Sequence, residues 1–211
     1  MIRIFSTLLL IAAATTAGYW LSQWYFQSGQ STPESLEASV LPQARSIADF
    51  NLTTHNQGSF NKASLQGKWT FLFFGYTQCP DVCPTTLAIM NNVARELERK
   101  SGHLNDVQFV FVSVDPERDT PEQLKQYVTY FHPQFIGATG QREQINHLTS
   151  QMSVMYFINK RAGGKQDQYT VDHSSAILLT EPSGNLRALF STPHVPDKIL
   201  EDFNKIREHY S

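Results

Sequence analysis

The sequence predicts a layered α/β domain with a hydrophobic segment at its N-terminus. Continuous apolar runs that suit buried strands alternate with stretches of helical periodicity, and the chain of 211 residues has room for one domain and an appendage. Its hydrophobic fraction of 41% is ordinary for a globular protein and provides for a sizeable core. The net charge of -2, without any cluster of Lys and Arg interleaved with aromatic residues, argues weakly against nucleic-acid binding.

The first half of the domain is expected to contain a β-hairpin and a strand–helix–strand unit. The hairpin is expected around Gln57-Gly58. The apolar run Trp69–Tyr76 predicts a buried central strand, and Val107–Val114 predicts a second one. Between them, the stretch from Cys83 to about Lys100 carries apolar residues at helical spacing and predicts an amphipathic helix.

The second half adds helices and another hairpin. Thr120 has the features of an N-cap, because proline follows it and Gln123 closes a capping box. The other elements expected are a helix over Arg142–Met152, a hairpin of strands Ser175–Thr180 and Leu186–Phe190, and a final amphipathic helix over Asp197–Tyr210. A β-α-β start followed by a β-β-α end is the plan of a thioredoxin-like fold, which is the fold that we predict.

The N-terminus carries a candidate transmembrane helix. Residues Ile4–Leu21 include no charged side chain and are long enough to cross a hydrocarbon core of roughly 30 Å. Arg3 precedes this run, and aromatic residues gather at its far end as they do at a membrane interface: Trp20, Trp24, Tyr25 and Phe26. The positive-inside rule then places the globular domain outside the cytoplasm. A signal peptide cleaved among the small residues 12–17 is the alternative, and it exports the domain equally.

The chain is therefore expected to have three parts. Residues 1–26 are the membrane anchor (or signal peptide), 27–45 are a flexible spacer rich in Ser, Gln, Pro and Glu, and 46–211 are the thioredoxin-like domain. No cysteine lies near the hydrophobic run, which excludes a lipoprotein anchor. The simplest placement is a single-pass protein of a bacterial inner membrane with its domain in the periplasm.

Two cysteines, Cys79 and Cys83, lie where the predicted central strand ends and the next helix begins. The free N–H groups and partial positive charge of a helix N-terminus stabilise a thiolate. Positions four apart on a helix share one face, so both sulfurs can point the same way and either close a disulfide or bind one ion. Inert burial and a structural disulfide are the simpler explanations. The position at a turn, and the small entropy gained by closing so short a loop, favour redox or metal chemistry instead.

A third ligand is expected at His173, just before a predicted core strand. In the thioredoxin plan this loop packs beside the cysteine turn, and redox thioredoxins carry a cis-proline there. No proline occurs between Lys165 and Thr180, so a donor atom takes the place of that proline. Two thiolates and an imidazole form a soft ligand set that suits Cu(I), Cu(II) or zinc. The neighbouring Asp172 is either an orienting partner of the imidazole or a solvated turn residue.

The other soft-ligand side chains are expected to lie outside the site. Met152 and Met155 lie near a predicted core helix and are expected to pack in it. Six histidines are expected at the surface: His55, His103, His132, His147, His194 and His209.

Three blocks of the sequence resemble the SCO/SenC family of copper-binding proteins. They are GYTQCPDVCP at Gly75–Pro84, VSVDPERDT at Val112–Thr120 and VDHS at Val171–Ser174. The blocks stand in the family's order and at family-like spacing, and the resemblance covers about residues 45–207. Two departures, Tyr76 where phenylalanine is common and a Ser-Ser pair after His173, leave every ligand in place.

The resemblance implies a thioredoxin-like fold that binds copper, as Cu(I) or Cu(II), through Cys79, Cys83 and His173. It implies a copper metallochaperone that assists the assembly of the copper A centre of cytochrome c oxidase, a binding and delivery protein rather than an enzyme. The partners implied are a copper-receiving oxidase subunit and another copper chaperone. No ligand role is expected for Asp115 to Thr120, whose Asp-Pro and Thr-Pro pairs read as a turn and a helix cap.

A thiol–disulfide reductase is the alternative function. Cys79, nearer the helix start, would attack and Cys83 would resolve, forming a Cys79–Cys83 disulfide. Such a protein would keep the cysteines of the oxidase copper site, or of another exported client, reduced. A thiol peroxidase is a more remote alternative, because the spacing of Thr77 and Cys79 differs by one from the peroxidatic Thr-x-x-Cys motif and no matching arginine is evident.

Overall fold

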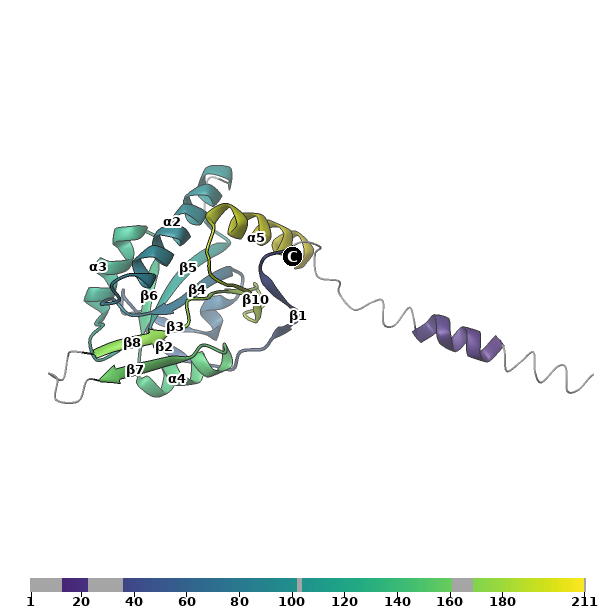
Figure 1. Cartoon of the computed structure of the whole chain (residues 1–211), viewed down its shortest axis with the longest axis horizontal. Helices are drawn as coiled ribbons and strands as arrows, with labels where there is room; N and C mark the ends of the chain where they lie inside the picture. The colour runs from purple at the N-terminus through teal and green to yellow at the C-terminus, as the bar shows by residue number, and fades with distance from the viewer. Residues whose placement is uncertain (1–12, 23–35, 102–103, 161–168, 211) are drawn as a thin grey trace, which may run out of the picture. The chain divides into compact units, whose positions relative to one another are not determined.

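The computed structural model describes residues 13–22, 36–101, 104–160 and 169–210 (Figure 1). The chain divides into two units, Met1–Thr32 and Pro33–Ser211. In the first unit, residues 13–22 form a helix. No helix in the described part of the chain is both long enough and apolar enough to cross a membrane. The rest of the expected anchor, 1–26, and residues 27–35 of the expected spacer lie outside the described residues, so the transmembrane helix is not confirmed.

A mixed sheet of eight strands, in the order β1-β10-β9-β4-β5-β6-β2-β3, forms the centre of the second unit (Figure 1). Its strands are β1 (Ser39–Arg45), β2 (Asn51–Thr54), β3 (Ser59–Asn61), β4 (Trp69–Gly75), β5 (Val107–Ser113), β6 (Ile136–Thr139), β9 (Ile177–Thr180) and β10 (Leu186–Phe190). Strand β4 runs parallel to β5 and antiparallel to β9, and β9 forms a hairpin with β10. This is the predicted β-α-β and β-β-α arrangement, and the α/β thioredoxin-like fold is confirmed.

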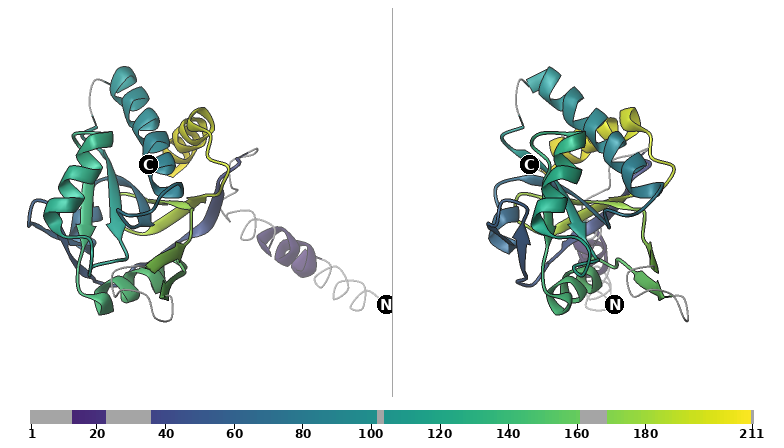
Figure 2. Two further views of the ribbon diagram at one scale, coloured as in Figure 1. Left: turned by 60° about the vertical axis from the view of Figure 1, so that its left-hand side comes forward. Right: turned by 90° about the vertical axis from the view of Figure 1, so that its left-hand side faces the viewer.

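Helices cover both faces of this sheet (Figure 2). One face packs against α2 (Val82–Ser101), α3 (Pro121–Phe131) and α5 (Pro196–Tyr210). The other packs against α4 (Arg142–Gln151), a 3-10 helix η1 (Lys62–Leu65) and a separate two-stranded sheet of β7 (Tyr156–Lys160) and β8 (Tyr169–His173). Alternate residues of β4 face the two cores, because side chains of a strand point to opposite sides: Phe71 and Phe73 to one, Leu72 and Phe74 to the other.

The strands β4 and β5 and the start of α3 form as their sequences predict. Every residue of β4 and of β5 is buried, which explains why both read as continuous apolar runs. Helix α3 begins with the expected capping box: the Thr120 hydroxyl accepts from the Gln123 amide at 3.3 Å, and the Gln123 side chain accepts from the Thr120 amide at 2.9 Å.

The folded domain begins before residue 46, contrary to the expected spacer of 27–45. Strand β1 pairs with β10 through Ser39 opposite Leu189 and Val40 opposite Ala188. The buried carboxylate of Asp202 on α5 accepts from the Glu37 and Ala38 amides at 3.0 and 2.8 Å and holds the entry to β1. Because β1 is an edge strand and mostly exposed, its composition is polar enough to resemble a linker.

Two histidines and a methionine differ from expectation. His55 and His132 are buried, not at the surface. The Nδ1 of His55 accepts a hydrogen bond from the Gly137 amide at 2.9 Å, and the Nδ1 of His132 accepts one from the Gln134 amide at 3.2 Å. Met152 is buried as expected, whereas Met155 is 69% exposed and the prediction that it packs is wrong. His147 and His209 are exposed, His194 is half-buried, and His103 lies outside the described residues.

Substituting Gly75→Ala should destabilise the domain by about 1–3 kcal/mol, as overpacking of a core does. A Cβ at this position would lie 2.4 Å from the Cys83 sulfur and 2.9 Å from the Phe111 ring, too close for either to remain in place. Urea unfolding of the reduced protein measures the change. The control is Gly58→Ala in an exposed turn, where a Cβ meets only a side-chain oxygen at 3.3 Å. Equal stability of the two variants would contradict this account of Gly75.

Candidate metal centre

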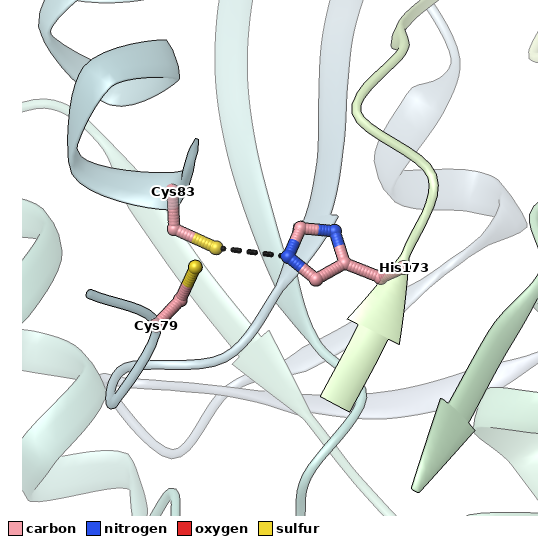
Figure 3. A group of neighbouring side chains, drawn as sticks. All are labelled: Cys79, Cys83 and His173. Carbon is pink, nitrogen blue, oxygen red and sulfur yellow. Dashed lines mark hydrogen bonds between the residues drawn. The ribbon is translucent and has the colours of Figure 1, made fainter. Parts of the chain in front are cut away.

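Three side chains from different segments meet at the ends of β4 and β5 (Figure 3). Cys79 lies in the loop 76–81, Cys83 lies in the first turn of α2, and His173 is the last residue of β8. Their ligand atoms all lie within 4.8 Å of one another. Within the described residues, this is the one group of three or more His, Cys, Asp or Glu side chains close enough to hold an ion. The structure thus brings together the three residues that the sequence predicted.

The two sulfurs converge by a turn and not by helical spacing. Helix α2 begins at Val82, so Cys79 precedes it and the two residues do not share a helix face as expected. Instead the chain folds back after β4, and the Cys79 amide donates to the Tyr76 carbonyl at 3.2 Å. This turn leaves Cys79 half-buried beside Cys83, which is fully buried. The two sulfurs are not bonded to each other.

The imidazole of His173 is held with one nitrogen towards the sulfurs. Its Nδ1 lies 3.0 Å from the Ser174 carbonyl, to which it can only donate, and its Nε2 lies 3.3 Å from the Cys83 sulfur. The rings of Phe73 and Tyr76 each make a T-shaped contact with the imidazole, with centroids 5.9 Å apart. The lone pair of Nε2 therefore points at the site, as a metal ligand requires.

Asp172 is exposed, as the second of its two predicted roles required, but it lies within strand β8 and not in a turn. Its carboxylate accepts from the Asn159 side chain at 2.7 Å on the neighbouring strand. The carbonyl of Ser174, and not this carboxylate, orients the imidazole.

The two thiols differ strongly in acidity. A hydrogen bond from Cys83 lowers the pKa of Cys79 to about 4, against the opposing effect of burial and with further help from backbone amides. The pKa of Cys83 is raised, because its proton bonds to Cys79 and because the side chain is buried. At neutral pH the apoprotein therefore holds one thiolate and one thiol.

Sequence reasoning missed the polar residues that support this loop. The carboxylate of Asp119, fully buried, accepts from the Thr77 amide at 2.9 Å, from the Thr77 hydroxyl at 2.6 Å and from the Ser113 hydroxyl at 2.5 Å. The sequence predicts only a turn and a helix cap for the segment around Asp119. The block VSVDPERDT carried a signal for this role, because it contains more charged residues than a turn and a helix cap use.

The donor set fits a soft metal ion. Two sulfurs select Cu(I) or zinc, and an imidazole suits copper in either oxidation state. The site is open to solvent on the side of Cys79 and His173, because these two residues are only partly buried, whereas Cys83 is fully buried. A ligand from another molecule can approach from that side.

Comparisons with known proteins agree with the site. The family model for SCO1/SenC matches residues 39–208. The chain is 39% identical over 155 residues to an SCO2-like protein of Rickettsia felis, which covers 72% of this chain and 73% of that protein. It is 41% identical over 182 residues to protein SCO2 homolog, mitochondrial, of Homo sapiens, which covers 85% of this chain and 64% of that protein. The crystal structure of Arabidopsis thaliana ScoI with copper bound matches with a TM-score of 0.70 at 35% identity and covers 78% of this chain and 99% of that one.

In the reduced, metal-free protein, Cys79 should react with iodoacetamide as a thiolate down to about pH 5, with a midpoint near pH 4. The rate of alkylation should fall as the pH drops through this lowered pKa, because the reactive thiolate is present above the pKa and is protonated below it. Substituting Cys83→Ala removes the hydrogen bond that lowers this pKa most, so the midpoint should rise towards that of an ordinary thiol. Mass spectrometry of the alkylated peptide gives the rates. A wild-type midpoint above pH 7 would contradict the assignment, and Cys79→Ala controls for reaction at Cys83.

Proposed function

Because the chain belongs to the SCO1/SenC family, we propose that it binds copper through Cys79, Cys83 and His173 and delivers it during the assembly of cytochrome c oxidase. The family resemblance noted in the sequence is confirmed, and copper is the metal. The observation that carries the proposal is the convergence of two sulfurs and one imidazole nitrogen within 4.8 Å. A homologue of the same fold is known with copper bound.

Loading the site requires a proton to leave. Copper binds thiolates, and in the apoprotein Cys83 holds the proton that it shares with Cys79. The buried Cys83 sulfur then has a metal ion in place of its proton, which removes the cost of a buried anion. Delivery would proceed from the side of Cys79 and His173, where an acceptor's ligands can reach the ion.

The second candidate function is thiol–disulfide reduction, and the acidity of Cys79 favours it. A thiolate beside a buried thiol is the arrangement of a nucleophile and its resolving partner. The Cys79 thiolate would attack the disulfide of an exported client and form a mixed disulfide. Cys83 would then displace the client's sulfur, so that two electrons pass to the client and Cys79–Cys83 becomes the disulfide. Copper would not bind this oxidised form, so redox state would gate loading.

We also propose that residues 1–26 anchor the domain in a bacterial inner membrane, with the folded domain, β1 included, in the periplasm. The uncharged run Ile4–Leu21 and the aromatic residues after it support this placement. A tethered domain suits a copper-receiving partner that is itself a membrane-bound oxidase subunit, because tethering raises the local concentration of one for the other.

The full-length protein should bind one copper per chain, with a thiolate-to-copper charge-transfer band. In His173→Ala we expect the band to be lost and Cu(II) affinity to fall at least about 100-fold, more than the loss of a residue that merely orients a ligand. The matched control is His147→Ala, an exposed histidine on α4. Isothermal titration and absorption spectra measure both variants. Equal copper affinity in His173→Ala and wild type would rule out the three-ligand site.

Delivery and reduction differ in what the cell requires of His173. In a strain that lacks this protein, oxidase activity should be restored by the wild-type chain but not by His173→Ala, Cys79→Ser or Cys83→Ser, because all three residues bind the metal. Added copper should partly restore activity without the protein. Reductant alone restoring activity, together with full function of His173→Ala, would favour the reductase.

A further inference from the structure

We propose that Arg118 is a positioning residue that ties the histidine strand to the cysteine loop and thereby determines whether the site offers copper three ligands or two. The inference rests on the proposed function and concerns the same site. It assigns a role to a residue that touches neither sulfur nor imidazole in the contacts described above.

The need for a tie follows from the topology. The cysteines belong to the rigid body of the domain, because the loop and α2 continue directly from the buried strand β4. His173 belongs to β8, which pairs with β7 in a two-stranded sheet of its own. A two-stranded sheet is at best marginally stable alone, so its place on the domain depends on side-chain contacts. On the β7 side, the hydroxyl of Tyr156 donates to the side-chain oxygen of Asn146 at 2.5 Å and accepts from the Arg142 guanidinium at 3.2 Å, and both partners lie on α4.

On the β8 side, the guanidinium of Arg118 makes the connection. Its Nη1 donates to the carbonyl of Tyr169, the first residue of β8, at 3.0 Å. The same nitrogen donates to the side chain of Gln78, next to Cys79, at 3.2 Å. One group thus contacts both ligand-bearing segments, at the residue before one cysteine and at the start of the strand that ends in His173.

The guanidinium is itself held firmly. Its Nε donates to the Asp115 carboxylate at 2.5 Å, and the other oxygen of that carboxylate accepts from the Tyr169 hydroxyl at 2.5 Å. The guanidinium carbon lies 3.6 Å from the centroid of the Tyr169 ring, a stacked cation–π contact. The side chain of Asp115 is fully buried and that of Arg118 is 9% exposed. Arg118, Asp115 and Tyr169 therefore each contact the other two and are largely shielded from solvent, which strengthens these contacts.

The adjacent residue completes the support. Asp119 fixes the cysteine loop at Thr77, so two successive residues of one segment hold the two halves of the ligand set. Lysine cannot replace Arg118 here, because it lacks the planar fork that reaches a carboxylate, an amide oxygen and a carbonyl together.

The tie has different consequences for the two oxidation states of copper. Two thiolates suffice to select Cu(I), and they stand on the rigid body. Cu(II) depends more on the imidazole, which stands on the separately folded sheet. Loosening β8 should therefore weaken Cu(II) binding while Cu(I) binding changes little.

The test compares Arg118→Lys with Arg187→Lys in the full chain. Arg187 is the matched control, because it is also a buried arginine with a carboxylate partner, Glu181, and a stacked ring, Tyr210, but lies on β10. We expect Arg118→Lys to lower Cu(II) affinity about 10–100-fold and Cu(I) affinity less than about 3-fold. In the metal-free protein, hydrogen exchange of the β8 amides should become faster, with β4 unchanged. Arg187→Lys should alter neither.

Two further variants keep the test decisive if Arg118→Lys does not fold. Tyr169→Phe removes the bond to Asp115 but keeps the ring, and Gln78→Ala removes one contact at the surface. Each should show a smaller change in the same direction. Unchanged Cu(II) affinity, or an equal loss of Cu(I) and Cu(II), would overturn the proposal. Failure of the wild-type protein to bind copper would instead overturn the proposed function, and the hydrogen-exchange measurement would still decide the role of Arg118.

Discussion

The placement of the Cys83 sulfur is the constraint on which the rest of the site depends. It is fully buried against the end of β4, so close to Gly75 that a Cβ there would lie 2.4 Å away. This contact fixes where α2 begins relative to the sheet, and it brings the sulfur to the carboxyl ends of the parallel strands β4 and β5. With one sulfur fixed, a single turn at Tyr76–Cys79 is enough to bring the second beside it.

Burial also makes the two sulfurs chemically unequal. The site cannot hold two close thiolates without a cation, because the inner one is removed from water and the outer one is already charged. Either a proton or a metal ion must therefore lie between them, or the two sulfurs must become a disulfide. Copper binding and thiol redox chemistry use the same atoms for this reason, and one physical arrangement supports both of the proposed functions.

The sequence predicted the parts of the fold whose local signals agree with their tertiary setting. β4 and β5 are buried on both faces, and the cap of α3 lies within four residues, so their patterns are visible without the rest of the structure. β6, β7 and β8 were not predicted, because none of them carries an apolar run as long as those of β4 and β5. His173 was still found, because its signal is the missing proline before β9. Arg118 was not, since a buried arginine and an exposed one look alike in a sequence and only the fold brings Tyr169 beneath it.

The division of the three candidate ligands between a rigid body and a small separate sheet suits the proposed delivery of copper. A site with all its ligands on one rigid frame holds an ion by preorganisation and releases it slowly. Here the two sulfurs stand on the frame, and the imidazole stands on a strand held by side-chain contacts around Asp115, Arg118 and Tyr169. In the proposed delivery, an acceptor that approaches from the side of Cys79 and His173 would displace the imidazole first, because β7 and β8 form a sheet of their own, whereas the cysteines follow directly from β4. The two sulfurs would hold the ion until the acceptor's ligands replace them.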